Sequence, residues 1–314
     1  DFWPGPLSDN EGVTSKEICD KWDQFFEVQG SEIEEHQRLF EEAKAGLITY
    51  TEDMIPLGVK GWPGKRNPYF FSVHQFDLPD TDQGLAGFWD NDMDGTYDPL
   101  KGDFPMIEIR GCEELPPQFP DEMIFWIYND EGGGAVHGET NGIAIRMEVQ
   151  VQSFAYATND QLNDMTFQRY KLINRAVEDI DSTYFAMWVD ADLGCYLDDY
   201  IGCDIDRSLA YTYNADAEDG QPGITCDGVP TYGTDVPIIG IDYFRGPRDE
   251  FLNELGMSSF TYFNNPSFGN PPPPPGTTDP STDVQFYNYL SGQWRDGTPF
   301  TFGGDGYDPT STQV

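Results

Sequence analysis

The segment from Asp90 to Pro99 carries the clearest chemical signal in this sequence. It reads Asp-Asn-Asp-Met-Asp-Gly-Thr-Tyr-Asp-Pro, so carboxylates stand at alternate positions and Gly95 follows the third of them. A hard divalent cation such as Ca²⁺ binds roughly six to eight oxygen atoms. A short loop supplies them when alternate side chains point inward and a residue that tolerates positive φ makes the sharp bend. The spacing therefore predicts a calcium-binding loop.

The predicted ligands follow the order of an EF-hand loop. In that pattern ligands stand at positions 1, 3, 5, 7 and 9, a glycine at position 6 and a bidentate Glu at position 12. Position 12 is Lys101 in this sequence, and the next carboxylate is Asp103. No clear helices flank the segment, so it is similar to the loops of dockerins and thrombospondin type 3 repeats. An Asp-rich turn that binds no metal is the alternative. The ligands expected from positions 1 to 9 are Asp90, Asp92, Asp94, the carbonyl of Thr96, and Asp98.

A second acidic group follows residues 183–190, an apolar segment that we expect to form a buried strand. Carboxylates delivered by the end of a strand and the loop after it can converge on one point. Unpaired carboxylates packed together repel one another and raise their pKa values unless a cation neutralises them. We therefore expect a second calcium site, with a solvated acidic loop whose Asp residues cap turns as the alternative. Its candidate ligands are Asp190, Asp192, Asp198, Asp199 and Asp204.

The chain of 314 residues is strongly acidic, with 56 Asp and Glu against 17 Lys and Arg and a formal charge of −39. Phosphate binding needs a basic surface, so nucleic acids and anionic membranes are not expected as partners. Aromatic residues make up 15% of the sequence, more than a disordered acidic tail carries, so we expect a folded chain. No apolar stretch is long enough to insert into a bilayer. Bound cations, a solvated acidic surface, or both account for the charge.

The N-terminal part combines two predicted helices with a long irregular region. Apolar residues at helical spacing predict helices at 14–28 and 31–45. Residues 51–120 are rich in Pro, Gly and Asp and show little regular period. Such a long irregular segment is uncommon unless something orders it, and the acidic loop is the candidate. We expect residues 1–120 to form a helical and loop-rich region with an Asp-rich calcium loop.

From residue 121 onward the pattern is that of β-strands. Residues 142–157 alternate, and we expect the face with Glu148, Gln150 and Gln152 to be wet. Short connections favour antiparallel pairing. The expected fold is mainly β with some α. It is an antiparallel β-sandwich or jelly-roll-like body at 121–314, with an N-terminal helical pair and long calcium-ordered loops, or one continuous domain. The expected strands are 123–128, 142–157, 166–174, 183–190, 209–214 and 238–244.

Five cysteines bear on the redox environment. None forms a CxxC pair, and with only 3 histidines a zinc site is not expected. Cys195, Cys203 and Cys226 cluster in an Asp- and Gly-rich region, where one disulfide is expected in an oxidising compartment. The sequence leaves open which two are paired, and small buried cysteines are the alternative. The other two are Cys19 and Cys112.

Longer segments stand out together at residues 1–7, 90–105, 181–185, 188–194 and 198–204, including Asp-Phe-Trp-Pro-Gly-Pro-Leu at the start and Trp-Val-Asp-Ala-Asp-Leu-Gly at 188–194. This set resembles large uncharacterised surface proteins of Bacteroidetes-type bacteria, which are substrates of the type IX secretion system. The resemblance covers most of the chain and implies secretion, calcium and a β-rich body, with no assigned activity. It also implies that Asp103 replaces the missing Glu at loop position 12. The sequence lacks the signal peptide and sorting domain of that group, so we expect a segment of a longer polypeptide.

The expected function is that of a non-catalytic structural or adhesive module of an extracellular, cell-surface protein, with loops stabilised by calcium. Its expected partners are other parts of a longer polypeptide, a second copy of itself or a surface glycan. No catalytic signature of the GxSxG, HExxH or Gly-rich phosphate-loop type is present in the sequence.

Two alternatives stay open. A polysaccharide hydrolase would use two carboxylates as acid and base or nucleophile, with Glu139 and either Glu148 or Asp190 as candidates. In a chain so rich in acids, such a pair is a weak signal. A carbohydrate-binding module would instead stack sugars on surface aromatic residues, and its candidates are Trp62, Trp89 and Trp294.

Overall fold

The structure is a computed structural model, and it describes residues 1–9, 11–109, 119–132, 136–220, 226, 228–267 and 271–310. Over these residues the chain is mainly β with some α and its sheets are antiparallel, which confirms the predicted fold class. A sandwich or jelly roll stays a prediction. The chain divides into two compact units, Asp1–Asp181 and Ser182–Val314, which are described separately.

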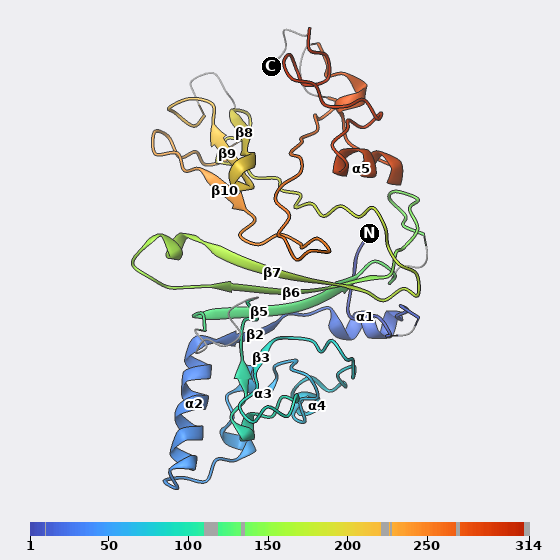
Figure 1. Cartoon of the computed structure of the whole chain (residues 1–314). Coiled ribbons are helices and arrows are strands. Elements are labelled where there is room, and N and C mark those ends of the chain that lie inside the picture. Colours follow the sequence, from blue (N-terminus) through green and yellow to red (C-terminus); the bar gives the residue numbers. More distant parts are fainter. Residues whose placement is uncertain are drawn as a thin grey trace. The chain divides into compact units, whose positions relative to one another are not determined.

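The first unit is built on an antiparallel sheet with the strand order β1-β5-β6-β7 (Figure 1). Strand β2 also pairs with β5, along the same edge as β1. The boundary expected at residue 120 instead lies inside this unit, because β2 precedes it and pairs with β5, which follows it. The strands are β1 (Trp3–Pro4), β2 (Phe26–Gln29), β5 (Glu122–Asn129), β6 (Met147–Ala155) and β7 (Thr166–Asn174).

Helices and loops lie over one face of this sheet (Figure 1). Helix α2 (Gly30–Lys44) matches the predicted second helix, whereas α1 (Lys16–Trp22) ends before the predicted residue 28. Residues 26–29 form β2 instead, because Phe26 and Val28 alternate along the chain and are buried where β2 pairs with β5. None of the described helices is long and apolar enough to cross a membrane. The short elements are η1 (Glu52–Met54), α3 (Leu57–Lys60), α4 (Phe70–His74), β3 (Phe88–Trp89), η2 (Pro99–Lys101), β4 (Phe104–Pro105) and η3 (Gln161–Asp164).

The irregular region between α2 and β5 packs an aromatic core against the sheet. Trp62, Phe70 and Tyr97 are buried in one cluster with residues of β2 and β5. The Trp62 indole donates to the carbonyl of Gly87 at 2.9 Å, and the Tyr97 hydroxyl donates to the carbonyl of Val59 at 2.7 Å. Large aromatic side chains contribute strongly to core stability when their polar ends find partners in this way. Aromatic packing therefore orders much of a region in which the sequence indicated only a bound cation as the ordering element.

The face of β6 predicted to be wet is buried. Glu148, Gln150 and Gln152 have exposed fractions of 0%, 1% and 1%. The strand register places the two glutamines opposite apolar core residues of β5. Their side-chain amides donate to the backbone carbonyls of Gly84 at 3.1 Å and Met106 at 3.0 Å. Buried backbone carbonyls need hydrogen-bond donors, and the glutamines of β6 supply them to the packed loops. The alternation of polar and apolar residues along β6 therefore does not show which face of the strand meets solvent.

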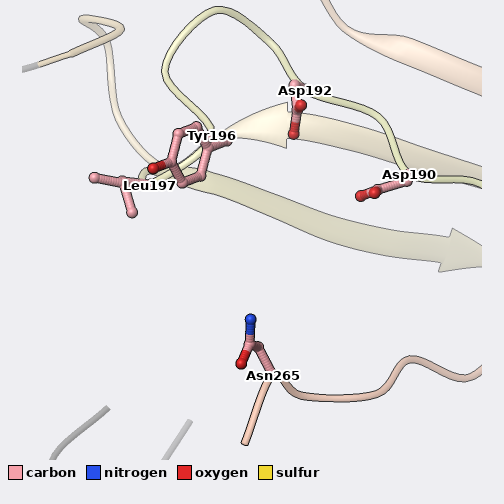
Figure 2. A pocket seen from close by; sticks show the side chains of 5 residues that line it. All are labelled: Asp190, Asp192, Tyr196, Leu197 and Asn265. Atoms are coloured by element: carbon pink, nitrogen blue, oxygen red, sulfur yellow. The ribbon is translucent and has the colours of Figure 1, made fainter. Parts of the chain in front are cut away.

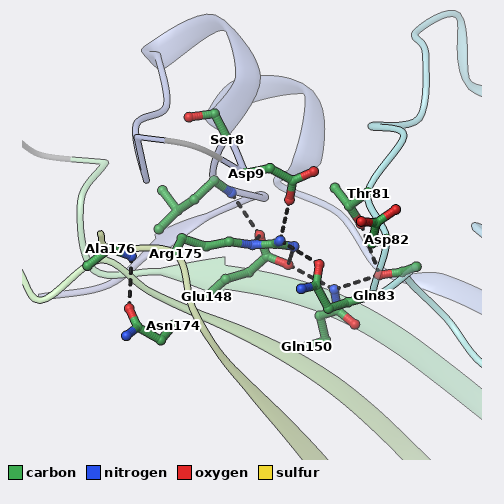
Figure 3. A network of polar contacts seen from close by, with 12 residues as sticks. Ser8, Asp9, Thr81, Asp82, Gln83, Glu148, Gln150, Asn174, Arg175 and Ala176 are labelled. Carbon is green, nitrogen blue, oxygen red and sulfur yellow. Dashed lines mark hydrogen bonds and ion pairs between the residues drawn. The ribbon is translucent and has the colours of Figure 1, made fainter. Parts of the chain in front are cut away.

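Glu148 forms a buried ion pair with Arg175, which follows the end of β7 (Figure 3). Two contacts join the side chains, from Arg175 Nε to Glu148 Oε2 at 3.1 Å and from Nη2 to Oε1 at 3.0 Å. The guanidinium also contacts Asp9 and donates to Gln83 Oε1 at 2.8 Å, and the amide of Leu7 donates to Glu148 at 2.9 Å. The pair therefore connects the N-terminal segment, the loop before β3 and the central strands.

The second unit contains an antiparallel sheet with the order β10-β9-β8 (Figure 1). Strands β9 and β10 fall within predicted strands, and β8 forms where the sequence predicts an acidic loop. Residues 183–190, predicted to be a buried strand, form no strand in the structure and are exposed. The apolar composition of residues 183–190 predicts burial, but a strand also needs a neighbouring strand with free backbone N–H and C=O groups, and this segment pairs with none in the described residues. The elements are β8 (Asp199–Asp204), η4 (Ile205–Arg207), β9 (Leu209–Asn214), β10 (Ile239–Asp242), η5 (Pro275–Thr277) and α5 (Asp283–Leu290).

The buried ion pair gives a stability prediction. Arg175→Met leaves the Glu148 carboxylate buried without its cation, so we expect the free energy of unfolding to fall by about 3–5 kcal/mol in urea titrations. Arg66→Met is the matched control, because Arg66 pairs with Asp80 on the surface and should lose less than about 1 kcal/mol. Adding Glu148→Gln to Arg175→Met should restore part of the loss. Equal small losses in the Arg175 and Arg66 variants would contradict the assigned role.

Candidate metal centres

The acidic loop at 90–98 folds as a tight turn around the Asp90 carboxylate. Gly95 has a φ of +77°, the left-handed conformation for which the pattern requires a glycine. The Asp90 carboxylate accepts hydrogen bonds from the backbone amides of Asp94 at 3.2 Å and Gly95 at 2.7 Å. The Asp94 carboxylate accepts from the amide of Thr96 at 2.8 Å and from its hydroxyl at 2.5 Å. The loop is therefore closed by its own donors.

Asp103 connects the two ends of this loop. Its side chain is fully buried and accepts hydrogen bonds from the backbone amides of Asn91 at 2.8 Å and Asp98 at 2.7 Å. Burial raises the pKa of Asp103 to about 6, the charges of Asp90 and Asp92 act in the same direction, and the two amides oppose the shift. Because burial and the neighbouring carboxylates disfavour its ionised form, a nearby positive charge would stabilise the Asp103 carboxylate.

Three of the predicted ligands come together in this loop. One carboxylate oxygen from each of Asp90, Asp92 and Asp103 lies within 4.8 Å of the others, so these residues could hold a metal ion. Asp98 has a different role, because its carboxylate accepts from the amide of Leu100 at 3.0 Å and caps η2. Asp103 thus lies beside Asp90 and Asp92, and its role as the ligand at position 12 stays a prediction.

Lys101 places a positive charge in the same loop. Its ammonium group contacts the Asp94 carboxylate and lies 3.3 Å from Asp92 Oδ2. The hydrogen bond from Lys101, followed by those from Thr96, lowers the pKa of Asp94 to about 2, and the same carboxylates raise the pKa of Lys101. The residue that breaks the EF-hand pattern therefore acts as a tethered cation, and a metal ion has to compete with it for Asp92.

The second acidic group is organised by the β8–β9 ladder. Asp199 begins β8 and lies opposite Asn214, the last residue of β9, while Asp198 precedes β8. One oxygen of each carboxylate is satisfied, since Asp198 Oδ2 accepts from the amide of Gly220 at 3.0 Å and Asp199 Oδ2 from that of Leu193 at 2.8 Å.

Three side-chain oxygens at this end of the ladder are buried without a hydrogen-bond donor. They are the Oδ1 atoms of Asp198, Asp199 and Asn214. The Asp198 and Asn214 side chains are only 5% and 8% exposed, and burial followed by the charges of nearby Asp residues raises the pKa of Asp199. A buried acceptor without a donor is costly, so a bound cation would remove a real penalty here.

Asp219 fixes the loop around these oxygens. This buried residue, which the sequence analysis did not select, accepts from the amide of Cys195 at 2.8 Å and from that of Tyr232 at 2.5 Å. Asp198, Asp219 and Cys195 also form a compact group of candidate ligand atoms. Cys195 is bonded to Cys226 in a disulfide, so its sulfur is not available as a thiolate ligand. The donor set is therefore made of oxygen atoms.

The other predicted ligands of the second site lie elsewhere. Asp190 and Asp192 line an open hollow with Tyr196. Asp204 ends β8, five residues after Asp199 and therefore roughly 16 Å away along an extended strand, and it pairs with Arg207. The structure thus groups Asp198 with Asp219 beside Cys195, and it places Asp199, the next residue after Asp198, opposite Asn214 in the ladder. In the β8–β9 hairpin, Asn214 lies opposite Asp199, so the strand register is the signal that identifies Asn214. No sequence pattern indicates Asp219.

The structure shows which of the clustered cysteines are paired, a point that the sequence left open. Cys195 and Cys226 form a disulfide, while Cys19 and Cys203 are free thiols. Cys112 lies outside the described residues.

Most of the residues selected for the alternative functions are packed inside the first or the second unit, whereas Glu139 and Asp190 are exposed. Trp62 and Trp294 are buried, with exposed fractions of 0% and 3%, and Trp89 is half-buried in β3. The Trp294 indole donates to the carbonyl of Gly306 at 2.8 Å. Glu148 is fully buried in its ion pair, so it cannot reach a polysaccharide.

No family model, curated protein or solved structure matches this chain.

The acidic loop predicts opposite effects of two substitutions on calcium affinity. In an Asp198→Asn background that weakens the second site, Lys101→Ala should tighten calcium binding because the competing ammonium is gone. Asp103→Asn should weaken it at least about tenfold because a ligand charge is lost. Isothermal titration calorimetry measures both, with Lys44→Ala, a surface lysine paired with Glu41, as the control. Weaker binding in Lys101→Ala would contradict the competition.

The disulfide predicts a link between redox state and the β8–β9 site. The Cys195 amide donates to Asp219, so the double variant Cys195→Ser, Cys226→Ser frees the loop that Asp219 fixes. We expect a stability loss of about 3 kcal/mol and a smaller calcium-induced rise in melting temperature. Cys203→Ser, which removes a free thiol, should leave that rise unchanged. An undiminished calcium response in the double variant would show that the disulfide does not support the site.

Proposed function

We propose that this chain is a calcium-stabilised, non-catalytic structural or adhesive module of an extracellular bacterial surface protein. The observation that carries the proposal is the group of buried, unpaired oxygens on Asp198, Asp199 and Asn214. A folded chain that already carries a formal charge of −39 gains stability wherever a cation offsets carboxylate repulsion.

The chemistry of the donors favours calcium over other metals. Carboxylate and amide oxygens suit hard cations, and the one nearby sulfur is held in the Cys195–Cys226 disulfide. Backbone-anchored loop carboxylates can adopt the irregular geometry that calcium accepts and magnesium does not. Affinities in the range of about 10⁻⁴–10⁻³ M are typical of calcium sites in extracellular modules, and we expect this range here.

One feature supports the extracellular assignment, and another narrows the choice of partners. The Cys195–Cys226 disulfide is typical of oxidising compartments. The strong negative charge argues against nucleic acid as a partner. A longer polypeptide, a second copy of the chain or a surface glycan are the partners that we propose for such a module.

A structural role is favoured over hydrolysis because one of the two carboxylate pairs considered for hydrolysis, Glu139 with Glu148, is not available to a substrate. Glu148 is committed to Arg175 inside the first unit and has no path to a substrate. A two-carboxylate mechanism needs both groups at the scissile bond.

Removal of calcium tests the proposal directly. At a calcium concentration about 100-fold above Kd, binding contributes about 2.7 kcal/mol, so excess EDTA should lower the melting temperature by about 5–10 °C. Asp198→Asn should abolish most of that shift. Asp206→Asn, which removes the same charge at an exposed position of η4, should retain it. Magnesium should not replace calcium. Identical melting curves in calcium and EDTA would refute the proposal.

A further inference from the structure

An open hollow of about 500 Å³ lies beside the β8–β9 sheet in the second unit. Figure 2 shows the segment before β8 along one side of the hollow and Asn265, from a separate segment, across from it. Its volume falls in the range of roughly 300–1,000 Å³ that is usual for small-molecule sites. The residues that line it are Asp190, Asp192, Tyr196, Leu197 and Asn265.

Two carboxylates and one side-chain amide of the hollow are available to a ligand. Asp190 and Asp192 are exposed, and within the described residues neither carboxylate has a hydrogen-bond donor or an ion-pair partner. Asn265 Oδ1 accepts from the amide of Ser267 at 2.9 Å, which leaves the Asn265 Nδ2 group as a donor toward the hollow (Figure 2). The site therefore offers acceptors on one side and an amide donor on the other.

The apolar part of the hollow comes from the same segment as the carboxylates. Tyr196 and Leu197 are each 40% exposed, so a ring face and an aliphatic side chain meet the solvent next to the acids. A ligand that matches all of these groups has hydroxyls that both donate and accept, and a face of C–H groups that packs on an aromatic ring.

We propose that this hollow binds a neutral carbohydrate, with Asp190 and Asp192 accepting from sugar hydroxyls and Asn265 donating to one. The proposal rests on the adhesive role proposed above and names its ligand class. An organic cation would satisfy the carboxylates but would leave the Asn265 amide without an acceptor. An anion would face two carboxylates.

Saturation-transfer-difference NMR on the full chain with calcium tests this site. The probes are methyl glycosides of mannose, glucose and galactose, with spermidine as the organic cation. We expect transfer to at least one glycoside, with binding about tenfold weaker or more in Asp190→Ala and Asn265→Ala, because each removes a hydrogen bond. Asp235→Ala, an exposed aspartate outside the hollow, should bind as the parent chain does.

The outcomes separate this inference from the calcium proposal. Both pocket variants should keep the calcium-dependent melting shift, because neither residue supplies one of the unpaired oxygens. No transfer to any of the three glycosides, or transfer that survives both variants, would overturn the carbohydrate site while the melting shift still reports on calcium. Binding of spermidine without binding of a glycoside would also overturn it and would identify a site for organic cations.

Discussion

A carboxylate that leaves water must find a donor or a positive charge, and this constraint recurs through the structure. Glu148 is buried against Arg175 beneath the central strands. Asp103 is fully buried and is held by two backbone amides at the ends of its loop. Asp219 accepts from two further amides beside the disulfide. Asp198 keeps one oxygen without a donor, and we propose that a cation binds there.

The two acidic groups satisfy the constraint in different ways. The loop at 90–98 follows the calcium pattern closely, yet Lys101 already brings an ammonium group to Asp92 and Asp94. The β8–β9 group follows no recognised motif, yet its unpaired oxygens are buried and no lysine or arginine contacts them among the described residues. A close match to the calcium-loop pattern therefore does not by itself show which group has carboxylates without a positive partner. We expect the β8–β9 group to contribute more of the calcium-dependent stability than the loop at 90–98.

Sequence periodicity predicted the parts of the fold that local pattern determines. Strand β7 occupies the predicted residues 166–174, and Gly95 makes the expected bend. The errors share one cause, which is long-range packing. Residues 26–29 leave the helical pattern because β5 offers them a partner, and Gln150 turns inward because a loop carbonyl needs its amide. Of the residues in the second site that we propose, Asp198 and Asp199 were predicted, whereas Asn214 and Asp219 depend on strand register and loop closure that one sequence does not display.

The most direct measurement is a crystal structure of the chain grown with calcium, with anomalous difference density recorded at a long wavelength. We expect a calcium peak coordinated by the Oδ1 atoms of Asp198, Asp199 and Asn214, at distances of roughly 2.3–2.6 Å. A structure in which those oxygens bind only water or protein donors, with no calcium peak among them, would refute the proposed calcium site.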